Sequence, residues 1–427
     1  MPATQLPNGS PATASAVGEA IRNTATALQL SQPAAHLVHS DEGAIAVARE
    51  LAASFAVDAV QRDAERTPPV AEIEAFSNSG LWGMTVPKEF GGAGVSNMTL
   101  AEVIKLISAA DPSIGQIPQN HLYMIEAIRL DGTSEQKRFF FELALKGYRF
   151  GNAFSEVGTK NVLDVRTRLT PDPDCDGFRI TGTKFYSSGA LLAHWIPVVA
   201  LDESDHTVVG FVERGDPGLT LIDDWSSFGQ RTTCSGTTVL KDAFVRKDHV
   251  IDHWLAFERP TTMGAVAQII QAAVDTGIAV AALDDTLRFV RQTSRPWIDS
   301  NVERAVDDPL LLYRLGEVRI RVHAAELILR RAGELLDVAQ SDPTTETVAE
   351  AAIAVAESKA MSEDAAIFAA DRLHELAGTR STLGQYGLDR HWRNARTHTL
   401  HDPSRWKYYA IGNYALNGAP PPRHPWF

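Results

Sequence analysis

The order of hydrophobic patterns along the 427 residues constrains the fold more than any single motif does. Apolar residues recur at helical spacing over residues 36–150, in short strand-like runs over residues 151–255, and at helical spacing again over residues 256–427. A chain that reads as helices, then strands, then helices is typical of an α+β protein. We therefore expect an N-terminal helical domain, a central β-sandwich or barrel, and a C-terminal four-helix bundle over these three segments.

Residues 1–35 are rich in Ala, Ser, Thr and Pro, carry little charge and lack the apolar core of a signal peptide. We expect a loose tail there. Helical periodicity then predicts helices at residues 41–66, 70–79, 97–110, 118–130 and 134–147. Between the second and the third of these, the Pro and Gly residues of segment 81–94 predict a turn-rich connection.

The central segment contains strand-like runs at residues 178–189, 195–202, 207–213 and 237–245. The turn signals between such runs predict about seven or eight short antiparallel strands in all. Long helical patterns follow at residues 262–292, 308–340 and 344–376. Together with the final segment, these helices are long enough for a four-helix bundle.

The charge balance narrows the range of partners. The chain has 53 acidic and 40 basic residues, a net charge of −13, so its surface repels nucleic acid and anionic membranes, and neither is an expected partner. Its two cysteines, Cys175 and Cys234, cannot build a disulfide framework and fit a reducing compartment. No window approaches the ~18–20 uninterrupted apolar residues that a membrane helix needs. We expect a cytoplasmic protein.

Two histidines, His398 and His401, stand in the run RNARTHTLHDP near the end of the chain. Pro403 disfavours helical geometry at Asp402, so we expect a helix to end near His401 and to carry both imidazoles on one face. Two interpretations fit this spacing: the imidazoles face a reacting group and transfer protons, or they are a satisfied pair at a helix C-terminus. A metal site is not expected, because Asp402 is the only further ligand nearby.

Short polar residues of the central segment are candidates for binding a flat heteroaromatic ring. Asn152 and Ser155 lie in the turn GNAFSE, Ser188 lies in GTKFYSSG, and Trp225 and Ser235 lie in DDWSSFGQRTTCSGT. Each of these residues is equally consistent with a plain structural role in a turn or core. The sequence lacks a Walker loop, a Gly-x-Gly-x-x-Gly after a strand and a Gly-x-Ser-x-Gly elbow, which disfavours a P-loop or Rossmann nucleotide site and a serine hydrolase.

In this order, the segments resemble the acyl-CoA dehydrogenase superfamily. Within it they are most similar to the flavin-dependent monooxygenase branch, which includes dibenzothiophene monooxygenase and the sulfur-acquisition oxidoreductases. The likeness runs from about residue 40 and rests on LWGMTVPKEFGGAG at 81–94, ADPSIGQIPQNH at 110–121, GNAFSE at 151–156, GTKFYSSG at 182–189, IDDW…SGT at 222–237, RPW at 295–297 and YGLDRHWRNARTHTLHDP at 386–403. The dehydrogenases carry a glutamate base near the position of His401, where this chain has the run Leu400-His401-Asp402-Pro403.

The resemblance implies a two-component monooxygenase. Reduced FMN (FMNH2) from a separate NAD(P)H-dependent flavin reductase would react with O2 to give a C4a-hydroperoxide, and oxygen would pass to the sulfur of a small organosulfur compound in sulfur acquisition. One alternative is an acyl-CoA dehydrogenase-like oxidoreductase with FAD, and another is a helical flavoprotein without activity. The usual assembly of the superfamily implies a homotetramer.

The resemblance also assigns roles to individual residues. The flavin ring and its ribityl chain would be lined by Asn152, Ser188, Trp225 and Ser235. His398 and His401 would stand near the reacting edge, where the hydroxyl of Ser188 can also donate a hydrogen bond, and His121 would close the pocket from the helical domain.

Two arginines and two pocket residues complete this set. Arg295 and Arg380 match positions that hold the flavin phosphate across a subunit boundary, a role that suits the arginine fork. The alternative for each arginine is a surface or interface salt bridge. Asn120 and Met263 stand at pocket positions that are Tyr and Phe in dibenzothiophene monooxygenase, which favours a smaller or more polar substrate.

Overall fold

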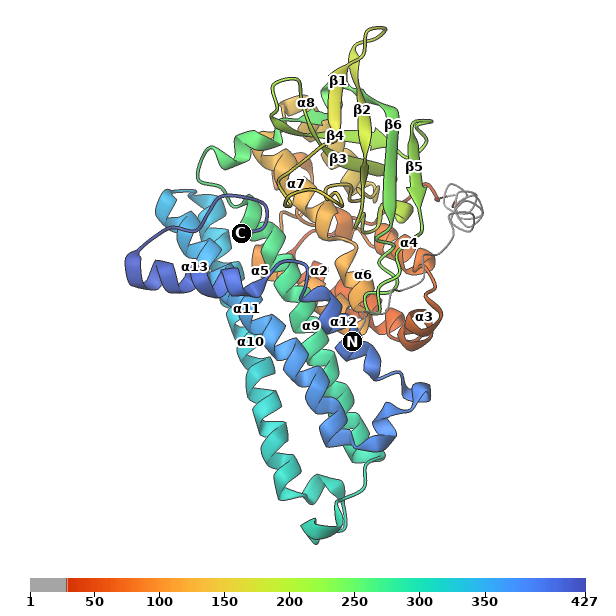
Figure 1. Ribbon diagram of the computed structural model, residues 1–427, viewed down its shortest axis with the longest axis vertical. Helices are drawn as coiled ribbons and strands as arrows, with labels where there is room; N and C mark the ends of the chain where they lie inside the picture. The colour runs from red at the N-terminus through yellow and green to blue at the C-terminus, as the bar shows by residue number, and fades with distance from the viewer. Residues whose placement is uncertain (1–27, 29) are drawn as a thin grey trace, which may run out of the picture.

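A computed structural model describes residue 28 and residues 30–427 of the chain. Most of the loose tail expected at residues 1–35 therefore lies outside the described residues. Figure 1 shows the sheet at one end of the molecule and the long C-terminal helices extending from it toward the other end. The helices of the N-terminal part pack between them and cover one side of the sheet.

The N-terminal part contains seven α-helices among the described residues: α2 (Asp41–Phe55), α3 (Ala59–Glu65), α4 (Val70–Asn78), α5 (Asn97–Ala110), α6 (Pro112–Gln116), α7 (Gln119–Asp131) and α8 (Ser134–Leu145). The single helix predicted at residues 41–66 is wrong, because the chain breaks between α2 and α3. The buried guanidinium of Arg62 takes the Phe55 carbonyl, which a continuous helix would have bonded to residue 59. The prediction also missed the five-residue helix α6, which Asp111 caps and Pro112 begins.

Seven strands form one hydrogen-bonded sheet in the order β5-β6-β2-β1-β3-β4-β7. Their bounds are β1 (Arg168–Pro171), β2 (Gly177–Lys184), β3 (Trp195–Leu201), β4 (Thr207–Glu213), β5 (Leu219–Ile222), β6 (Thr237–Arg246) and β7 (Val250–Ile251). The sheet folds over on itself, because Gly210 of β4 lies against Val245 of β6. The expectation of purely antiparallel strands is wrong for one pair: β1 and β3 run parallel, since the β2–β3 connection crosses the sheet end and returns beside β1.

The C-terminal part contains α9 (Met263–Gln292), α10 (Pro309–Ser341), α11 (Thr345–Ala377), α12 (Asp389–His398) and α13 (Ser404–Asn417). The three long helices match the predicted segments closely. The final segment differs from expectation, because it forms two short helices, α12 and α13, on either side of a turn at residues 399–403. Helix α5 packs along α9 and α10 and so extends the bundle into the N-terminal part.

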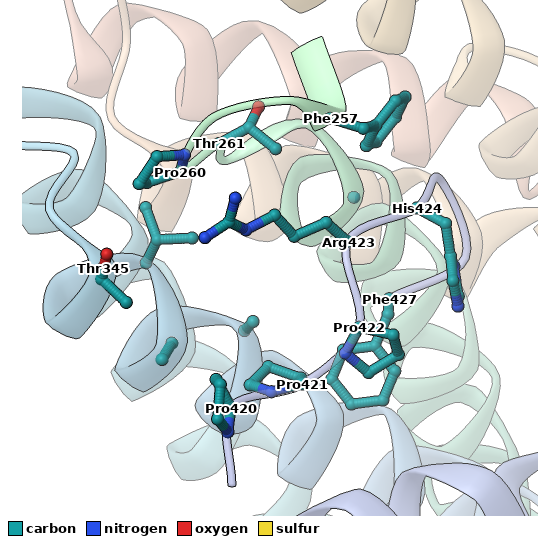
Figure 2. A pocket seen from close by; sticks show the side chains of 14 residues that line it. Phe257, Pro260, Thr261, Thr345, Pro420, Pro421, Pro422, Arg423, His424 and Phe427 are labelled. Carbon is teal, nitrogen blue, oxygen red and sulfur yellow. The ribbon is translucent and has the colours of Figure 1, made fainter. Parts of the chain in front are cut away.

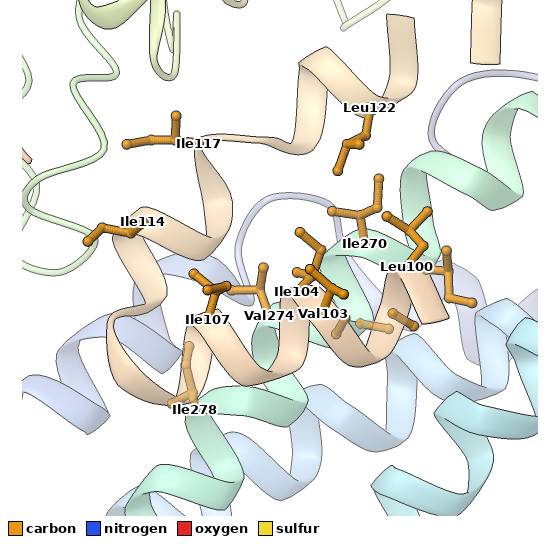
Figure 3. Close-up of a cluster of buried hydrophobic side chains, with 14 of the residues drawn as sticks. Leu100, Val103, Ile104, Ile107, Ile114, Ile117, Leu122, Ile270, Val274 and Ile278 are labelled. Atoms are coloured by element: carbon orange, nitrogen blue, oxygen red, sulfur yellow. The ribbon is translucent and has the colours of Figure 1, made fainter. Parts of the chain in front are cut away.

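The main core lies where α5 crosses α9. Figure 3 shows Ile104 and Ile107 of α5 facing Val274 and Ile278 of α9, and all four side chains are fully buried. Gly277 lets the two helix backbones approach, since a Cβ atom built there would lie 2.6 Å from the Lys105 carbonyl oxygen.

Helix α9 is the most apolar of the long helices, although Gln268, Gln271 and Asp275 interrupt its apolar run. It contains an 18-residue window with a mean hydropathy of 1.6, which is apolar enough for a membrane span by length and composition. However, 89 % of that window is buried inside the fold. Its apolarity is therefore accounted for by its position among α5, α10 and α11, as in the core helix of a globular fold.

Candidate functional site

Four of the predicted site residues line one cavity: Asn120, Asn152, Ser155 and His401. The cavity has a volume of about 50 Å³, and its other lining residues are Gln119, Tyr123, Phe154, Ala267, Gln268, Pro425 and Trp426. We call it the inner cavity. The start of α7, the segment that enters the sheet, the start of α9, the turn after α12 and the C-terminal segment all contribute to it.

Hydrogen bonds hold residues 151–155, the part of the central segment that lines the inner cavity, in place. The Asn120 amide donates to the Gly151 carbonyl at 2.6 Å, and the Asn152 side-chain oxygen accepts from the Phe154 backbone N–H at 3.1 Å. The Ser155 carbonyl accepts from the Phe185 N–H at 2.9 Å, which ties this turn to the end of β2. The polar groups at the cavity are thus fixed before any ligand binds.

His401 is the histidine that lines the inner cavity. Its side chain is 34 % exposed, and its Nδ1 lies 3.2 Å from the Asp402 carboxylate. An ionised carboxylate accepts the Nδ1 proton, which leaves Nε2 as the acceptor; Nε2 lies 3.4 Å from the Gln271 amide nitrogen. This arrangement presents an imidazole of fixed orientation to the cavity, as the first interpretation of the histidine pair requires.

His398 is placed differently, contrary to its prediction as a catalytic group. It is buried behind His401, with the two ring centroids 6.5 Å apart. Its Nδ1 lies 2.6 Å from an Asp275 oxygen and its Nε2 lies 3.0 Å from the Gln116 oxygen, so both nitrogens are occupied. Desolvation lowers the pKa of His398, although Asp275 opposes this shift. For His398 the structure therefore supports the interpretation as a satisfied histidine.

Behind both histidines lies a cluster of buried charges formed by Lys359, Asp275, Glu363, Asp402 and Lys407. The Lys359 ammonium lies 3.3 Å from Asp275 and 2.6 Å from Glu363, and Lys407 lies 3.2 Å from Asp402. With every group ionised, the three carboxylates exceed the two ammonium groups by one charge. Burial, opposed by Lys359, raises the pKa of Glu363 to about 7, so a proton on Glu363 balances the cluster.

His121 lies outside the inner cavity, contrary to its prediction as a catalytic and pocket residue. The ring is fully buried; its Nε2 donates to the Trp82 carbonyl at 2.9 Å, and its Nδ1 accepts from the Phe150 N–H at 3.1 Å. Burial lowers the pKa of His121 to about 3. A neutral imidazole with two backbone partners joins α7 to the start of the central segment and is not free to transfer protons.

A cluster of hydroxyls lies on neighbouring loops of the sheet. Ser188 and Ser235 are 2.6 Å apart, and Ser235 is 2.7 Å from Thr233. Trp225 donates its indole N–H to the Gln230 carbonyl at 2.8 Å. These residues do not line the inner cavity, but hydrogen bonds through Thr233 and the Gln230 carbonyl join Ser188, Ser235 and Trp225 into one group.

Helix α12 connects this group with the histidines, because the Asn394 side chain accepts from the Gln230 N–H at 2.7 Å. The side-chain amide of Gln230 is buried and has no hydrogen-bond partner. Met263 also lies off the cavity: it is fully buried in the core, one helical turn before Ala267, which does line the cavity.

The two arginines lie far from the inner cavity within one chain. Arg295 follows the C-terminal end of α9, whereas the cavity lies at its N-terminal end, and a 30-residue helix spans about 45 Å. Arg380 is exposed at the same end and donates to the Thr293 carbonyl at 3.3 Å. The nearby side chains of Trp297 and Ile298 are 69 % and 80 % exposed. Within one chain, Arg295 and Arg380 therefore cannot contact a ligand that is bound in the inner cavity at the other end of α9.

Two functional candidates on α9 were missed, Gln268 and Gln271. Both are buried, Gln268 lines the inner cavity, and the side-chain oxygens of both have no hydrogen-bond partner. A buried amide oxygen without a partner is costly, which indicates a ligand that donates to it. The sequence did contain a signal, since Gln268, Gln271 and Asp275 form a polar stripe on an otherwise apolar helix.

Two sequence models of known domains match the chain. The acyl-CoA dehydrogenase N-terminal domain matches residues 42–147, and the acyl-CoA dehydrogenase C-terminal domain matches residues 269–405. These ranges contain most of the N-terminal helices and most of the C-terminal bundle.

Individual proteins match over most of the chain. The dibenzothiophene monooxygenase of Rhodococcus erythropolis is 35 % identical over 398 residues, which cover 90 % of this chain and 95 % of that protein. The FMN-bound structure of TdsC from Paenibacillus sp. A11-2 has a TM-score of 0.84 at 31 % identity and covers 90 % of this chain and 100 % of its own. The methanesulfinate monooxygenase MsuC of Pseudomonas fluorescens has a TM-score of 0.82 at 30 % identity, with coverage of 90 % and 99 %.

Proposed function

Because the chain belongs to the acyl-CoA dehydrogenase family and to its branch of flavin-dependent monooxygenases, we propose that it is a two-component monooxygenase that oxygenates the sulfur of a small organosulfur compound. One observation carries this proposal. Among the described residues that line the inner cavity there is no carboxylate, and the titratable groups that line it are the His401 imidazole and the Tyr123 phenol. Removal of an α-proton from an acyl thioester needs a carboxylate base there, whereas oxygen transfer to sulfur does not.

The residues fit FMN by their hydrogen-bonding chemistry. The unpartnered amide oxygens of Gln268 and Gln271 and the unpartnered amide of Gln230 are buried acceptors and donors. The polar edge of a heteroaromatic ring satisfies groups of this kind. Reduced FMN, when bound, supplies the two electrons that activate O2, through the C4a-hydroperoxide expected for this branch.

The reaction is balanced with a sulfinate as substrate: one oxygen atom of O2 joins sulfur to give a sulfonate, the other leaves as water, and reduced FMN becomes FMN. Within this reaction the protein holds and moves a proton. His401 lines the cavity with its Nδ1 held by Asp402, and its Nε2 accepts or returns a proton when it releases the Gln271 amide. Tyr123, Phe154 and Trp426 supply apolar surface that excludes water from the site.

A separate NAD(P)H-dependent flavin reductase belongs to this proposal, because the sequence lacks the glycine-rich motifs of a Rossmann nucleotide site. A role in sulfur acquisition and a cytoplasmic location also remain proposals. So does a homotetramer, which is supported by the distance of Arg295 and Arg380 from the cavity and by the exposed Trp297 and Ile298 beside them.

Rapid mixing tests the proposal. The protein is mixed anaerobically with reduced FMN and then with O2, and absorbance in the near ultraviolet is followed while methanesulfinate, dimethyl sulfone and dibenzothiophene are assayed as substrates with a reductase present. We expect a transient flavin adduct and an oxygenated sulfur product, and a faster decay of the adduct in His401→Ala. Tightly bound FAD that an acyl-CoA bleaches, without any adduct, would replace this proposal by a dehydrogenase.

A further inference from the structure

One buried lysine stands between the two aspartates that hold the histidine pair. Lys359 of α11 is fully buried, and its ammonium lies 3.3 Å from Asp275 of α9 and 3.9 Å from Asp402 in the turn after α12. Asp275 lies 2.6 Å from the Nδ1 of His398, and Asp402 lies 3.2 Å from the Nδ1 of His401. Among the described residues, Lys359 is the lysine that contacts both aspartates.

Two further charged groups surround this ammonium. Glu363 lies one turn later on α11, with an oxygen 2.6 Å from the Lys359 ammonium. Lys407 of α13 lies 3.2 Å from the second oxygen of Asp402. The side chains of Asp402 and Lys407 are 6 % and 3 % exposed, so water and salt screen these charges little.

The C-terminal segment, residues 418–427, covers the cluster from the side of α13. Figure 2 shows His424 and Phe427 on this segment. The Phe427 ring centroid lies 4.6 Å from the Lys407 ammonium, which also donates to the Trp426 carbonyl oxygen. Burial lowers the pKa of His424, so this imidazole adds no charge to the cluster near neutral pH.

A count of charges shows what depends on Lys359. With a proton on Glu363, the two ammonium groups of the cluster balance its two aspartates. Without Lys359 one buried negative charge is left over, which is costly, so a neighbouring group takes up a proton. Imidazole is the side chain that does so near neutral pH, and His401 is the imidazole held by Asp402.

The charge on Lys359 also acts on Asp402 directly. Burial raises the pKa of Asp402, but the opposing charges, with Lys359 the largest of them, hold this pKa well below its usual range. An ionised Asp402 accepts the Nδ1 proton of His401 and leaves Nε2 as the acceptor. A doubly protonated imidazole has no acceptor left, and it would also turn a second donor toward the Gln271 amide.

We propose that Lys359 is a positioning residue for the reaction: its buried ammonium keeps Asp402 ionised and His401 neutral, so that the Nε2 of His401 remains a proton acceptor at the inner cavity. This inference rests on the proposed function for the proton that His401 accepts. The protonation state of the imidazole is nevertheless a property of the protein without flavin or substrate, and it can be measured separately.

The test compares Lys359→Gln with Lys105→Gln, a matched control. Lys105 of α5 also lies between two carboxylates, 2.8 Å from Glu102 and 3.1 Å from Glu326, but outside the cluster. Diethyl pyrocarbonate acylates neutral imidazole, and mass spectrometry of the flavin-free proteins gives its rate at His401 between pH 5 and 9. Oxygenation of methanesulfinate with reduced FMN is measured over the same range.

We expect the modification of His401 in Lys359→Gln to require a pH about one unit or more above that of the wild type, because a nearby positive charge has been removed. The acidic limb of the oxygenation profile should move by the same amount, which lowers the rate on that limb by about tenfold. Lys105→Gln should match the wild type in both profiles.

The outcomes separate the two proposals. An unchanged modification profile in folded Lys359→Gln overturns the positioning role, even if the rate falls, and so does an equal shift in Lys105→Gln. If the shift is found but the wild type oxidises no sulfur compound, the positioning role holds and the proposed function fails. Should Lys359→Gln not fold, the double variant with Asp275→Asn, which removes one charge of each sign, is compared with Asp275→Asn alone, and the same shift decides.

Discussion

At the residue scale, the pair His398 and His401 shows how the environment separates two identical side chains. His401 is partly exposed at the inner cavity and has one nitrogen held by Asp402. His398, three residues earlier, is buried with both nitrogens bonded to Asp275 and Gln116. The same imidazole can exchange protons in the first position and serves packing in the second.

We therefore expect an alanine substitution at His401 to affect the reaction and one at His398 to affect stability. His401→Ala should lower the oxygenation rate by about 10²-fold or more, because a positioned proton carrier is lost, with little change in the free energy of unfolding. His398→Ala should lower the free energy of unfolding by about 3 kcal/mol, because Asp275 is left buried with one partner fewer. Single-turnover product formation and urea denaturation measure the two quantities. If the two variants exchanged these effects, the assignment of the histidines would be wrong.

Glu363 gives a pH-dependent prediction. Its pKa rises from 4.5 to about 7 in the folded protein, so the folded state holds a proton that the unfolded state releases. The stability that this proton contributes is present below pH 4.5 and is lost as the pH rises toward 7, a change of about 3 kcal/mol. In Glu363→Gln this loss is absent, so the variant should gain stability relative to the wild type as the pH rises from 5 to 8.

The difference between the two proteins is the quantity to measure, by urea denaturation at each pH. Burial lowers the pKa of His391 to about 4, as it does for His253, and such groups make stability rise with pH over part of the same range. They act equally in both proteins and cancel in the difference. A difference that does not change with pH would show that Glu363 is ionised throughout.

The sequence indicated part of the site. His401, Asn120, Asn152 and Ser155 were found because they lie in short polar motifs, and the structure brings them to one cavity. Gln268 and Trp426 were missed, since one lies in a long apolar helix and the other is the penultimate residue of the given sequence, far from any motif. Such residues reach the cavity through long-range packing, which local patterns do not contain.

At the element scale, local signals predicted long elements and failed for short ones. Helices α5, α9 and α10 were predicted almost to the residue, because periodicity and capping residues are local properties. The two-residue strand β7 and the order of the sheet depend on pairing between distant segments. The parallel contact of β1 with β3 belongs to this second group.

Two glycines in helices test the packing of these elements. Gly277 of α9 faces α5, where a Cβ atom would lie 2.6 Å from the Lys105 carbonyl oxygen and 2.7 Å from the Ser108 Cβ. Gly277→Ala should lower the free energy of unfolding by about 2 kcal/mol through this overlap. Gly412 of α13 has no atom within 4 Å of the same position, and Gly412→Ala should raise it by up to about 1 kcal/mol. Urea denaturation of both variants measures the contrast, and a neutral Gly277→Ala would contradict the close crossing of α5 and α9.

At the scale of the whole molecule, the surface carries apolar side chains that a single chain leaves uncovered. Tyr313, Ile320 and Leu327 recur every seven residues along α10 and are 67 %, 71 % and 57 % exposed. A seven-residue apolar repeat is typical of a helix face that packs against another helix. Together with Trp297 and Ile298 near Arg295, this face supports the proposed homotetramer, whose size in solution light scattering measures directly.

Mixing of subunits tests whether neighbouring chains complete each site. Arg295→Ala alone should lose FMN affinity, and His401→Ala alone should lose oxygenation. If Arg295 serves the site of a neighbour, unfolding the two variants together and refolding them as mixed assemblies creates some sites that have both residues intact. We expect such mixtures to recover a clear fraction of the wild-type rate, whereas the same variants mixed without exchange of subunits should not. Because about 45 Å of α9 separates Arg295 from the inner cavity of its own chain, the absence of recovery would mean that Arg295 holds no part of the cofactor.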